Sequence, residues 1–294
     1  MLAFKKDVLD ALNNNQPVVA LESTIISHGL PYPENLALAR EVETIIQNAG
    51  ATPATIAIMD GQIKIGLTDE ELQYLAESDD VIKASKRDFA YLLASKKTGA
   101  TTVAGTLLAA AMAGIRVFAT GGLGGVHRGG EDTLDISRDL EELSIQPVAV
   151  VSAGVKSILD IGRTLEYLET KGVEVIGYQS TFFPAFYTRQ SPYKVDYRLD
   201  TPGDVAALLH AKFDSGLEGG VLVANPIPEA FAMEEATIQK AIDQALKEAD
   251  SKGITGKAIT PYLLDAIKTI TNGKSLEANL ALMKHNAQVA AQIA

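Results

Sequence analysis

The chain has 294 residues, of which 47% are hydrophobic and 21% are charged, a balance typical of a globular protein and not of a disordered or fibrous one. Its formal net charge of −11 disfavours nucleic acid and anionic membranes as partners, so an anionic substrate would need a local cationic pocket. There is no cysteine, which excludes disulfides and thiolate metal sites and is compatible with the cytoplasm.

The chain shows no composition break, internal repeat or low-complexity linker, so we expect a single domain over residues 1–294. Residues 1–10 lack the apolar stretch and cleavage site of a signal peptide. The longest apolar stretch, Val103–Ile115, is too short to cross a bilayer and predicts a buried helix. We therefore expect a soluble cytoplasmic protein.

Short apolar runs alternate along the chain with longer segments of helical period. The predicted strands are Pro17–Leu21, Thr55–Met59, Arg116–Thr120, Val148–Val151, Glu174–Gly177 and Gly220–Ala224. The predicted helices are Glu34–Asn48, Thr68–Glu77, Arg87–Lys96, Thr101–Gly114, Lys156–Lys171, Pro202–Ser215, Glu229–Asp250, Pro261–Thr271 and Ser275–Ile293. Glycines stand where several of these helices should stop.

This alternation predicts a layered α/β/α fold with a mostly parallel, mixed central sheet. Continuous apolar runs suit strands that helices cover on both faces. Ile63–Gly66 is a candidate hairpin partner, because Asp60–Gly61 is a turn signal. In such sheets ligands bind at the carboxyl ends of the strands, so the residues that follow each strand are the place to look.

Glu22 directly follows the first predicted apolar strand. A carboxylate in that place is partly desolvated, which would raise its pKa and make it a candidate general acid or base. The alternative is a helix cap or an ion-pair partner. His28 lies in the loop that follows Glu22, so it is a second residue of interest there.

A glycine-rich loop, Thr120–Gly130, follows the predicted strand Arg116–Thr120. Glycine amides can approach an anion closely, and His127 and Arg128 favour a ligand loop over a plain flexible turn. No Gly-Lys-Ser/Thr sequence follows, so the loop is not a Walker loop.

The segment Asp132–Leu140 carries two carboxylates, Asp135 and Asp139, that would share one face if the segment were helical. Carboxylate oxygens suit Mn²⁺ or Mg²⁺, and Mg²⁺ usually keeps several waters. A solvated acidic helix start is the alternative, since the first turn of a helix favours aspartate.

Two lysines are candidates for chemistry. Lys156 stands where a predicted strand gives way, through small residues, to a predicted helix. The positive end of that helix would favour the neutral amine, which can attack an aldehyde and form a Schiff base. Lys83 lies with Lys86 and Arg87 in a basic cluster that could pair with a phosphate, or form a surface turn. Together the candidates indicate a sugar-phosphate enzyme without naming its substrate.

Several of these segments together resemble the pseudouridine-5′-phosphate glycosidase family, also called indigoidine synthase A-like proteins. The matching pieces run in family order from about residue 17 to the end and are Glu22–Thr24, His28–Pro31, Lys83, Arg87–Asp88, Thr101–Val103, Thr120–His127, Asp135–Leu140, Ser152–Asp160, Asn225–Pro228, Thr260–Leu264 and Glu277–Leu282. Each piece alone would be weak, but the set is highly specific.

The resemblance implies reversible conversion of pseudouridine 5′-phosphate and water to uracil and ribose 5-phosphate. In the family a lysine forms an imine with the ring-opened sugar, and Lys156 is the matching residue. Glu22 matches the family's proton donor and acceptor. Asp135 matches the residue that holds one divalent metal per subunit, usually Mn²⁺, with Mg²⁺ as the alternative.

The resemblance also implies substrate contacts and an assembly. The matching contacts are Lys83, the backbone at Val103, Ser137, Arg138, Asp139 and Asn279. We expect Thr120 and His127 to line the pocket as well, from their place in the glycine-rich loop. The resemblance also implies that the chain assembles into a homotrimer. The open alternatives are another sugar-phosphate enzyme, such as a kinase or an imine-forming aldolase, and a non-catalytic module that binds phosphorylated sugars or nucleosides.

Overall fold

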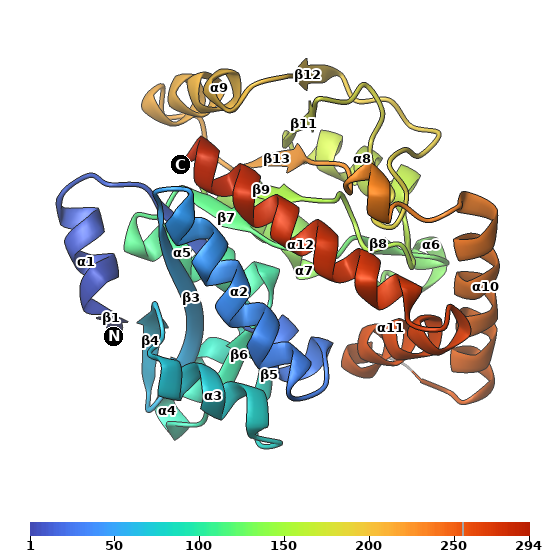
Figure 1. The fold of residues 1–294 in the computed structure, drawn as a ribbon, viewed down its shortest axis with the longest axis horizontal. Coiled ribbons are helices and arrows are strands. Elements are labelled where there is room, and N and C mark those ends of the chain that lie inside the picture. The colour runs from blue at the N-terminus through green and yellow to red at the C-terminus, as the bar shows by residue number, and fades with distance from the viewer. Residues whose placement is uncertain (255) are drawn as a thin grey trace.

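The fold is built around one large mixed sheet (Figure 1). A computed structural model describes residues 1–254 and 256–294. Most strands of the sheet are parallel, in the spatial order β3-β2-β7-β9-β13-β11-β12. Their bounds are β2 (Val18–Leu21), β3 (Thr52–Met59), β7 (Val117–Ala119), β9 (Ala149–Ser152), β11 (Glu174–Tyr178), β12 (Tyr197–Leu199) and β13 (Val221–Ala224).

Shorter strands extend the sheet beyond β3. Strand β4 (Gln62–Ile65) pairs antiparallel with β3 through the predicted Asp60–Gly61 turn, and β1 (Leu2–Phe4) pairs parallel with β4. Strand β6 (Gly99–Thr101) is antiparallel to β3, and β5 (Ile82–Ala84) lies parallel beside it. The carboxyl ends of β5 and β6 therefore meet the carboxyl end of β2. A separate ribbon joins β8 (Val126–His127) to β10 (Leu159–Asp160).

Helices cover both faces of the sheet, which confirms the predicted α/β/α layering. Helices α2 (Glu34–Asn48), α9 (Pro202–Asp214) and α12 (Lys274–Ile293) lie on one face, with α12 running across β7 and β9 (Figure 1). Helices α5 (Val103–Ala113), α7 (Arg138–Ile145) and α8 (Ile161–Thr170) lie on the other. Every residue of β9 and β13 is buried as a result. Burial of a valine or leucine side chain contributes about 1.5–3 kcal/mol, so these strands give the site a rigid support.

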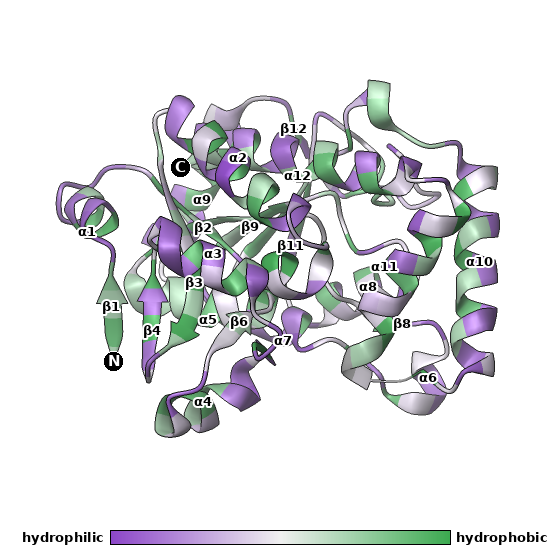
Figure 2. Ribbon diagram, turned by 60° about the horizontal axis from the view of Figure 1, so that its bottom comes forward, coloured by the Kyte–Doolittle hydropathy of each residue, from purple (hydrophilic) through white to green (hydrophobic). Residues whose placement is uncertain are grey.

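Helices α10 (Glu235–Ser251) and α11 (Ile259–Ile270) pack against each other at one end of the molecule. Figure 2 shows α10 striped in purple and green, as expected of a helix that buries only one face. The remaining elements are α1 (Lys6–Asn13), η1 (Ile25–Gly29), α3 (Asp69–Glu77), η2 (Lys86–Asp88), α4 (Phe89–Ser95), α6 (Gly130–Thr133), η3 (Glu229–Phe231) and η4 (Gly256–Ala258).

The differences from the predicted elements are confined to short segments. The sequence pattern missed β1, β5, β6, β8, β10 and β12, which have two or three residues each and show no period that a pattern can detect. It also missed the eight-residue helices α1 and α7. Two helix starts were also misplaced, because α8 starts at Ile161 and not at Lys156, and α10 starts at Glu235 and not at Glu229, where the chain forms only the short helix η3.

Candidate active site

A cavity of about 760 Å³ opens where the carboxyl ends of β2 and β9 face α5 and α7. Its lining comes from segments that are far apart in the sequence, from the end of β2 to the start of α11. The cavity brings together nine of the eleven predicted site residues. They are Glu22, Lys83, Val103, His127, Asp135, Ser137, Arg138, Asp139 and Lys156.

Glu22 lies at the floor of this cavity and is only 9% exposed. Burial raises the pKa of its carboxyl group, and the nearby Asp139 raises it further, while Lys156, Lys83 and the Thr120 hydroxyl oppose this without cancelling it. The hydroxyl of Thr120 donates a hydrogen bond to Oε1 of Glu22, at 2.5 Å. A carboxyl group with a raised pKa can hold a proton closer to neutral pH and release it, as the sequence predicted for this residue.

The residues after Glu22 fix the end of strand β2. The hydroxyl of Ser23 donates to the carbonyl of Ile56 at 2.6 Å and accepts from the amide of Thr101 at 2.8 Å. Thr24 donates to the carbonyl of Thr101 at 2.9 Å. These bonds join β2, β3 and β6 at the point where Glu22 leaves the sheet, so its backbone has little freedom.

Lys156 lies in a loop between β9 and β10, and not at the start of a helix. Its amide donates to the carbonyl of Leu123, and Val155 bridges to Leu123, so the glycine-rich loop holds this segment. Helix α8 begins five residues later, capped by Asp160, which accepts from the amide of Arg163. The prediction that a helix dipole acts on Lys156 is therefore wrong, although the residue does face the cavity that contains Glu22.

The glycine-rich loop packs tightly against neighbouring elements. The amides of Leu123, Gly124, Val126 and His127 all donate to protein acceptors. A Cβ atom on Gly124 would lie 2.2 Å from the hydroxyl of Ser137, so only glycine fits there. Close packing, and not an open cradle for an anion, accounts for the glycines at this end of the loop.

Asp139 ties together two walls of the cavity. It is 6% exposed, and its carboxylate accepts from the amide of Ala104 at the start of α5 and from the amide of Gly124, both at 2.8 Å. Ser137 caps α7 by accepting from the amide of Asp139. Asp135 precedes α7, so the predicted shared helix face of Asp135 and Asp139 is wrong. One of the two carboxylates is buried in backbone contacts, and the other lies at the cavity surface.

Asp135 and His127 form the one pair of predicted residues suited to a metal. The Asp135 side chain is 52% exposed, and its Oδ2 lies 3.9 Å from Nδ1 of His127. Burial and the charge of Lys156 lower the pKa of His127, and Asp135 only partly offsets this. Within residues 1–254 and 256–294, no group of three or more histidines or acids could enclose a metal ion. A single exposed carboxylate fits only an ion that keeps most of its waters, as Mg²⁺ commonly does.

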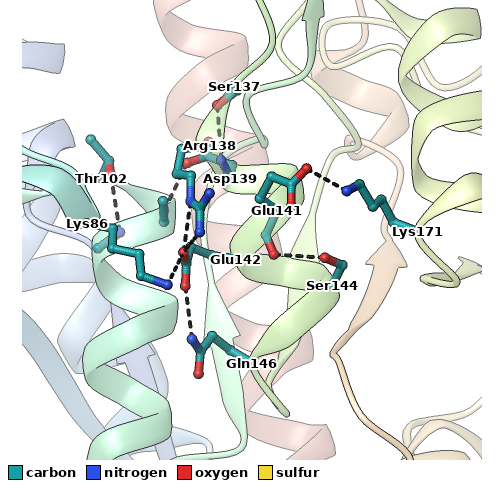
Figure 3. Close-up of polar contacts among 12 residues, drawn as sticks. Lys86, Thr102, Ser137, Arg138, Asp139, Glu141, Glu142, Ser144, Gln146 and Lys171 are labelled. Atoms are coloured by element: carbon teal, nitrogen blue, oxygen red, sulfur yellow. Dashed lines mark hydrogen bonds and ion pairs between the residues drawn. The ribbon is translucent and has the colours of Figure 1, made fainter.

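Basic side chains form the rim of the cavity, which we call the cationic rim and define as Lys83, Lys86, Arg87 and Arg138. Glu142, whose side chain is fully buried, lies beneath it (Figure 3). Its Oε1 accepts from Nζ of Lys86 at 2.9 Å and from Nη2 of Arg138 at 2.6 Å, and its Oε2 accepts from Gln146. Burial would raise the pKa of Glu142, but the hydrogen bonds from Lys86, Gln146 and Arg138 outweigh it and lower the pKa.

Residues 7–294 match the family described as indigoidine synthase A like protein. The chain belongs to this family. A pseudouridine-5′-phosphate glycosidase of Geobacillus kaustophilus is 60% identical over 293 residues, which cover 100% of this chain and 97% of that protein. The enzyme of the same name from Staphylococcus aureus is 56% identical, with 100% and 95% covered.

Solved structures of family relatives have the same fold. A prealnumycin C-glycosynthase in complex with ribulose 5-phosphate superposes with a TM-score of 0.92 at 41% identity, covering 100% of this chain and 95% of that one. An indigoidine synthase A-like protein from Thermotoga maritima gives a TM-score of 0.89 at 34% identity, with the same coverage. The fold therefore has experimental counterparts of similar length.

Two predicted residues of this family member lie away from the cavity lining. Thr120 is fully buried and contacts Glu22 instead. Asn279, on α12, lines a separate small cavity beside Tyr187. Conversely, the main cavity is lined by several residues that were not predicted as site residues, namely Thr24, Ser85, Thr102, Gly256 and Thr260. Thr102 could have been found as the cap of α5, but Thr260 reaches the cavity only through the packing of α11.

Proposed function

We propose that this enzyme reversibly cleaves the carbon–carbon glycosidic bond of pseudouridine 5′-phosphate, giving uracil and ribose 5-phosphate, with Lys156 as the covalent nucleophile. Relatives at 56% and 60% identity over essentially their full lengths carry the name of that activity. The observation on which the proposal rests is the placement of Lys156 and the buried Glu22 on one cavity, under a rim of basic side chains.

The bond to be broken joins two carbons, so the enzyme needs a place for the bonding electrons. In the synthetic direction the neutral amine of Lys156 attacks the aldehyde of ring-opened ribose 5-phosphate, and loss of water gives an iminium at C1. The C5 carbon of uracil then bonds to C1, and the electrons of the C=N bond move to nitrogen. Glu22 takes the proton that C5 loses. Ring closure through the sugar hydroxyl then displaces the lysine.

Cleavage is the reverse sequence, so Glu22 must donate the same proton. It protonates C5 of the base while the C1–C5 bonding electrons pass to uracil and the lysine nitrogen forms the iminium. Water then releases ribose 5-phosphate from Lys156. A carboxyl group that must both give and take a proton works best with a pKa close to the working pH, and the raised pKa of Glu22 supports this role.

We propose one divalent metal per subunit, Mn²⁺ or alternatively Mg²⁺, with Asp135 as its protein ligand and water in the other positions. The half-exposed carboxylate beside a cationic cavity supports this assignment. When bound, such an ion supplies a positive charge that orients and polarises oxygen atoms of the substrate.

The cationic rim is the proposed phosphate site. An enzyme with a net charge of −11 must collect an anionic substrate through a local excess of positive charge, and the rim provides it. Ser137 and the start of α5 at Val103 lie beside the rim and are the proposed contacts to the rest of the sugar phosphate.

We also propose a homotrimeric assembly, as the family resemblance implies, and a cytoplasmic location, with which the lack of cysteine is compatible. Among the helices of the described residues, none combines the length and the apolar character that crossing a membrane requires.

A trapping experiment tests the proposed function. Wild-type enzyme is mixed with ribose 5-phosphate and borohydride, and peptide mass spectrometry locates the reduced adduct, which we expect on Lys156. Parallel assays follow conversion of pseudouridine 5′-phosphate with and without chelator, and ATP consumption with free pseudouridine. An adduct on another lysine, or ATP-dependent turnover without cleavage, would contradict the proposal.

A further inference from the structure

A chain of buried polar side chains connects the C-terminal helix α12 to Glu22. Asn286, on α12, donates from Nδ2 to the carbonyl of Thr120 at 2.8 Å, with a longer contact of 3.3 Å to the carbonyl of Gly121. Thr120 donates in turn from its hydroxyl to Glu22. On the other side, Asn225 at the end of β13 donates to Oδ1 of Asn286 at 2.9 Å.

The far end of this chain is also anchored. Asn225 Nδ2 lies 3.1 Å from Nδ1 of His285, and His285 makes a hydrogen bond to the backbone of Pro226. Burial lowers the pKa of His285, which favours the neutral ring and lets Nδ1 accept from Asn225. The amide of Asn225 donates to the carbonyl of Ser152 at 2.8 Å, so the ends of β9 and β13 are joined as well.

These polar residues lie in an otherwise apolar interface. The neighbours of Asn286 on the buried face of α12 are Leu282, Met283, Ala287, Val289 and Ala290. Asn286 and Thr120 are fully buried, and Asn225 is 1% exposed. A buried amide costs free energy unless its donors and acceptors are matched, and an apolar side chain would pack there without that requirement. The polar residues therefore indicate that this contact orients the groups it joins and does more than hold α12 against the sheet.

We propose that Asn286 is a positioning residue for catalysis, which fixes the backbone of Thr120 so that its hydroxyl holds the carboxyl group of Glu22 toward Lys156. This inference rests on the proposed function of Glu22 as the proton donor and acceptor. Helix α12, which contributes no residue to the lining of the main cavity among the described residues, would then act on the reaction through one side chain.

Glu22 is faced by groups from several elements. Lys156 comes from the loop after β9, Lys83 from β5, Asp139 from α7 and Thr120 from the end of β7. Of these, Thr120 is the neutral partner that makes a direct hydrogen bond. Removal of that donor should raise the pKa of Glu22 further, because the hydrogen bond favours the charged form.

The first test compares Thr120→Val with Thr120→Ser in the cleavage assay. The limb of the pH–kcat profile that Glu22→Gln removes is assigned to Glu22. We expect Thr120→Val to move this limb to higher pH and to lower kcat about 10-fold or more, with KM within about 2-fold. Thr120→Ser keeps the hydroxyl and should restore both. Thr55→Val, which removes a hydroxyl donor to the partly buried Glu43 away from the cavity, is the matched control and should leave the limb in place.

The second test asks whether Asn286 acts through Thr120. Asn286→Ala should shift the same limb in the same direction by a smaller amount. It should add little in the Thr120→Val background, because a residue that acts through Thr120 has nothing left to position. If Asn286→Ala does not fold, Asn225→Ala is the second variant, since it removes the donor that holds Oδ1 of Asn286 together with the contact to His285 and leaves the Asn286 side chain in place.

The outcomes separate this inference from the proposed function. Wild-type enzyme that does not cleave pseudouridine 5′-phosphate overturns the proposed function. The inference alone is overturned if the wild type is active and the Asn286→Ala and Asn225→Ala variants lose stability but keep the wild-type pH profile. Asn286 would then only satisfy the carbonyl groups at the end of the strand. Additive effects of Asn286→Ala and Thr120→Val would overturn it too.

Discussion

Two buried glutamates, one at the floor of the cavity and one beneath its cationic rim, have opposite electrostatic surroundings. Glu22 has a hydroxyl partner and nearby charges of both signs, and burial raises its pKa. The side chain of Glu142 is also inaccessible to solvent, yet hydrogen bonds from Lys86, Gln146 and Arg138 lower its pKa. Burial alone therefore does not decide the charge of a carboxyl group; the number of donors directed at it does.

This difference indicates two different roles. A raised pKa favours exchange of a proton with a substrate, whereas a lowered pKa favours a carboxylate that holds cationic partners in place. We therefore expect substitutions at the floor to lower kcat and substitutions at the rim to change KM and stability.

Lys156→Ala should abolish both synthesis and cleavage, with a loss of kcat on the order of 10⁵-fold, because the proposed imine forms on the amine that this substitution removes. Lys156→Arg is the matched control for charge, since it keeps a cation but cannot form an imine, and it should be equally inactive. Steady-state assays with either substrate pair give the measurement. A Lys156→Arg variant with more than a few per cent of wild-type activity would show that the lysine contributes only charge.

Glu22→Gln should lower kcat about 10²- to 10⁴-fold, the range expected when a general acid or base is removed. KM should change little, because the amide keeps the size of the side chain and can still accept from Thr120. Glu43→Gln is the control: Glu43 is a partly buried glutamate with a raised pKa, caused mainly by burial, and a threonine donor, but it does not line the cavity. Comparable loss of kcat in both variants would indicate a general packing defect and break the distinction drawn for the floor.

Asp135→Asn should raise the Mn²⁺ concentration required for half-maximal activity roughly 10- to 100-fold, since the charge of the ligand sets much of the affinity for a hard cation. Direct Mn²⁺ binding, followed by electron paramagnetic resonance, gives a readout that does not depend on turnover. Asp132→Asn, three residues earlier and outside the cavity lining, serves as the control. Unchanged Mn²⁺ affinity in Asp135→Asn would remove Asp135 as the metal ligand.

The floor and the rim of the cavity also differ in how far their residues could be predicted from the sequence. The floor was predictable because Glu22 and Lys156 each follow an apolar run that forms a buried strand, and parallel strands bring their carboxyl ends to one edge. The reason given for Lys156 was wrong, since Ser157–Asp160 forms a turn and the short strand β10 before α8 begins. Such short pairings depend on partners that are distant in the chain.

The rim was predictable only in part. The basic cluster around Lys83 was visible in the sequence, but its buried counterion was not. Glu141 and Glu142 are adjacent, identical residues of α7, and no local pattern distinguishes them. Only the docking of α7 directs Glu142 toward Lys86 and Arg138, and Glu141 toward Lys171 (Figure 3).

This pair supplies the smallest and most specific prediction. Glu142→Gln should raise KM for pseudouridine 5′-phosphate about 3- to 10-fold at unchanged kcat, because Lys86 and Arg138 lose the charge that aligns them. The same substitution should lower the free energy of unfolding by about 2 kcal/mol at pH 7. Glu141→Gln is matched in residue type, helix and chemistry but faces away from the cavity, so its KM should stay at the wild-type value.

The pH dependence of this stability difference has a definite sign. The pKa of Glu142 is lowered in the folded protein, so its contribution is complete above the ordinary glutamate range of about 4.3 and is lost as the pH falls through the lowered folded value. Urea unfolding at pH 7 and at pH 4 should therefore show the gap between wild type and Glu142→Gln narrowing at the lower pH. A gap that widens there would contradict the lowered pKa of Glu142. A fall in kcat without a change in KM would mean that Glu142 takes part in the reaction although cations surround it.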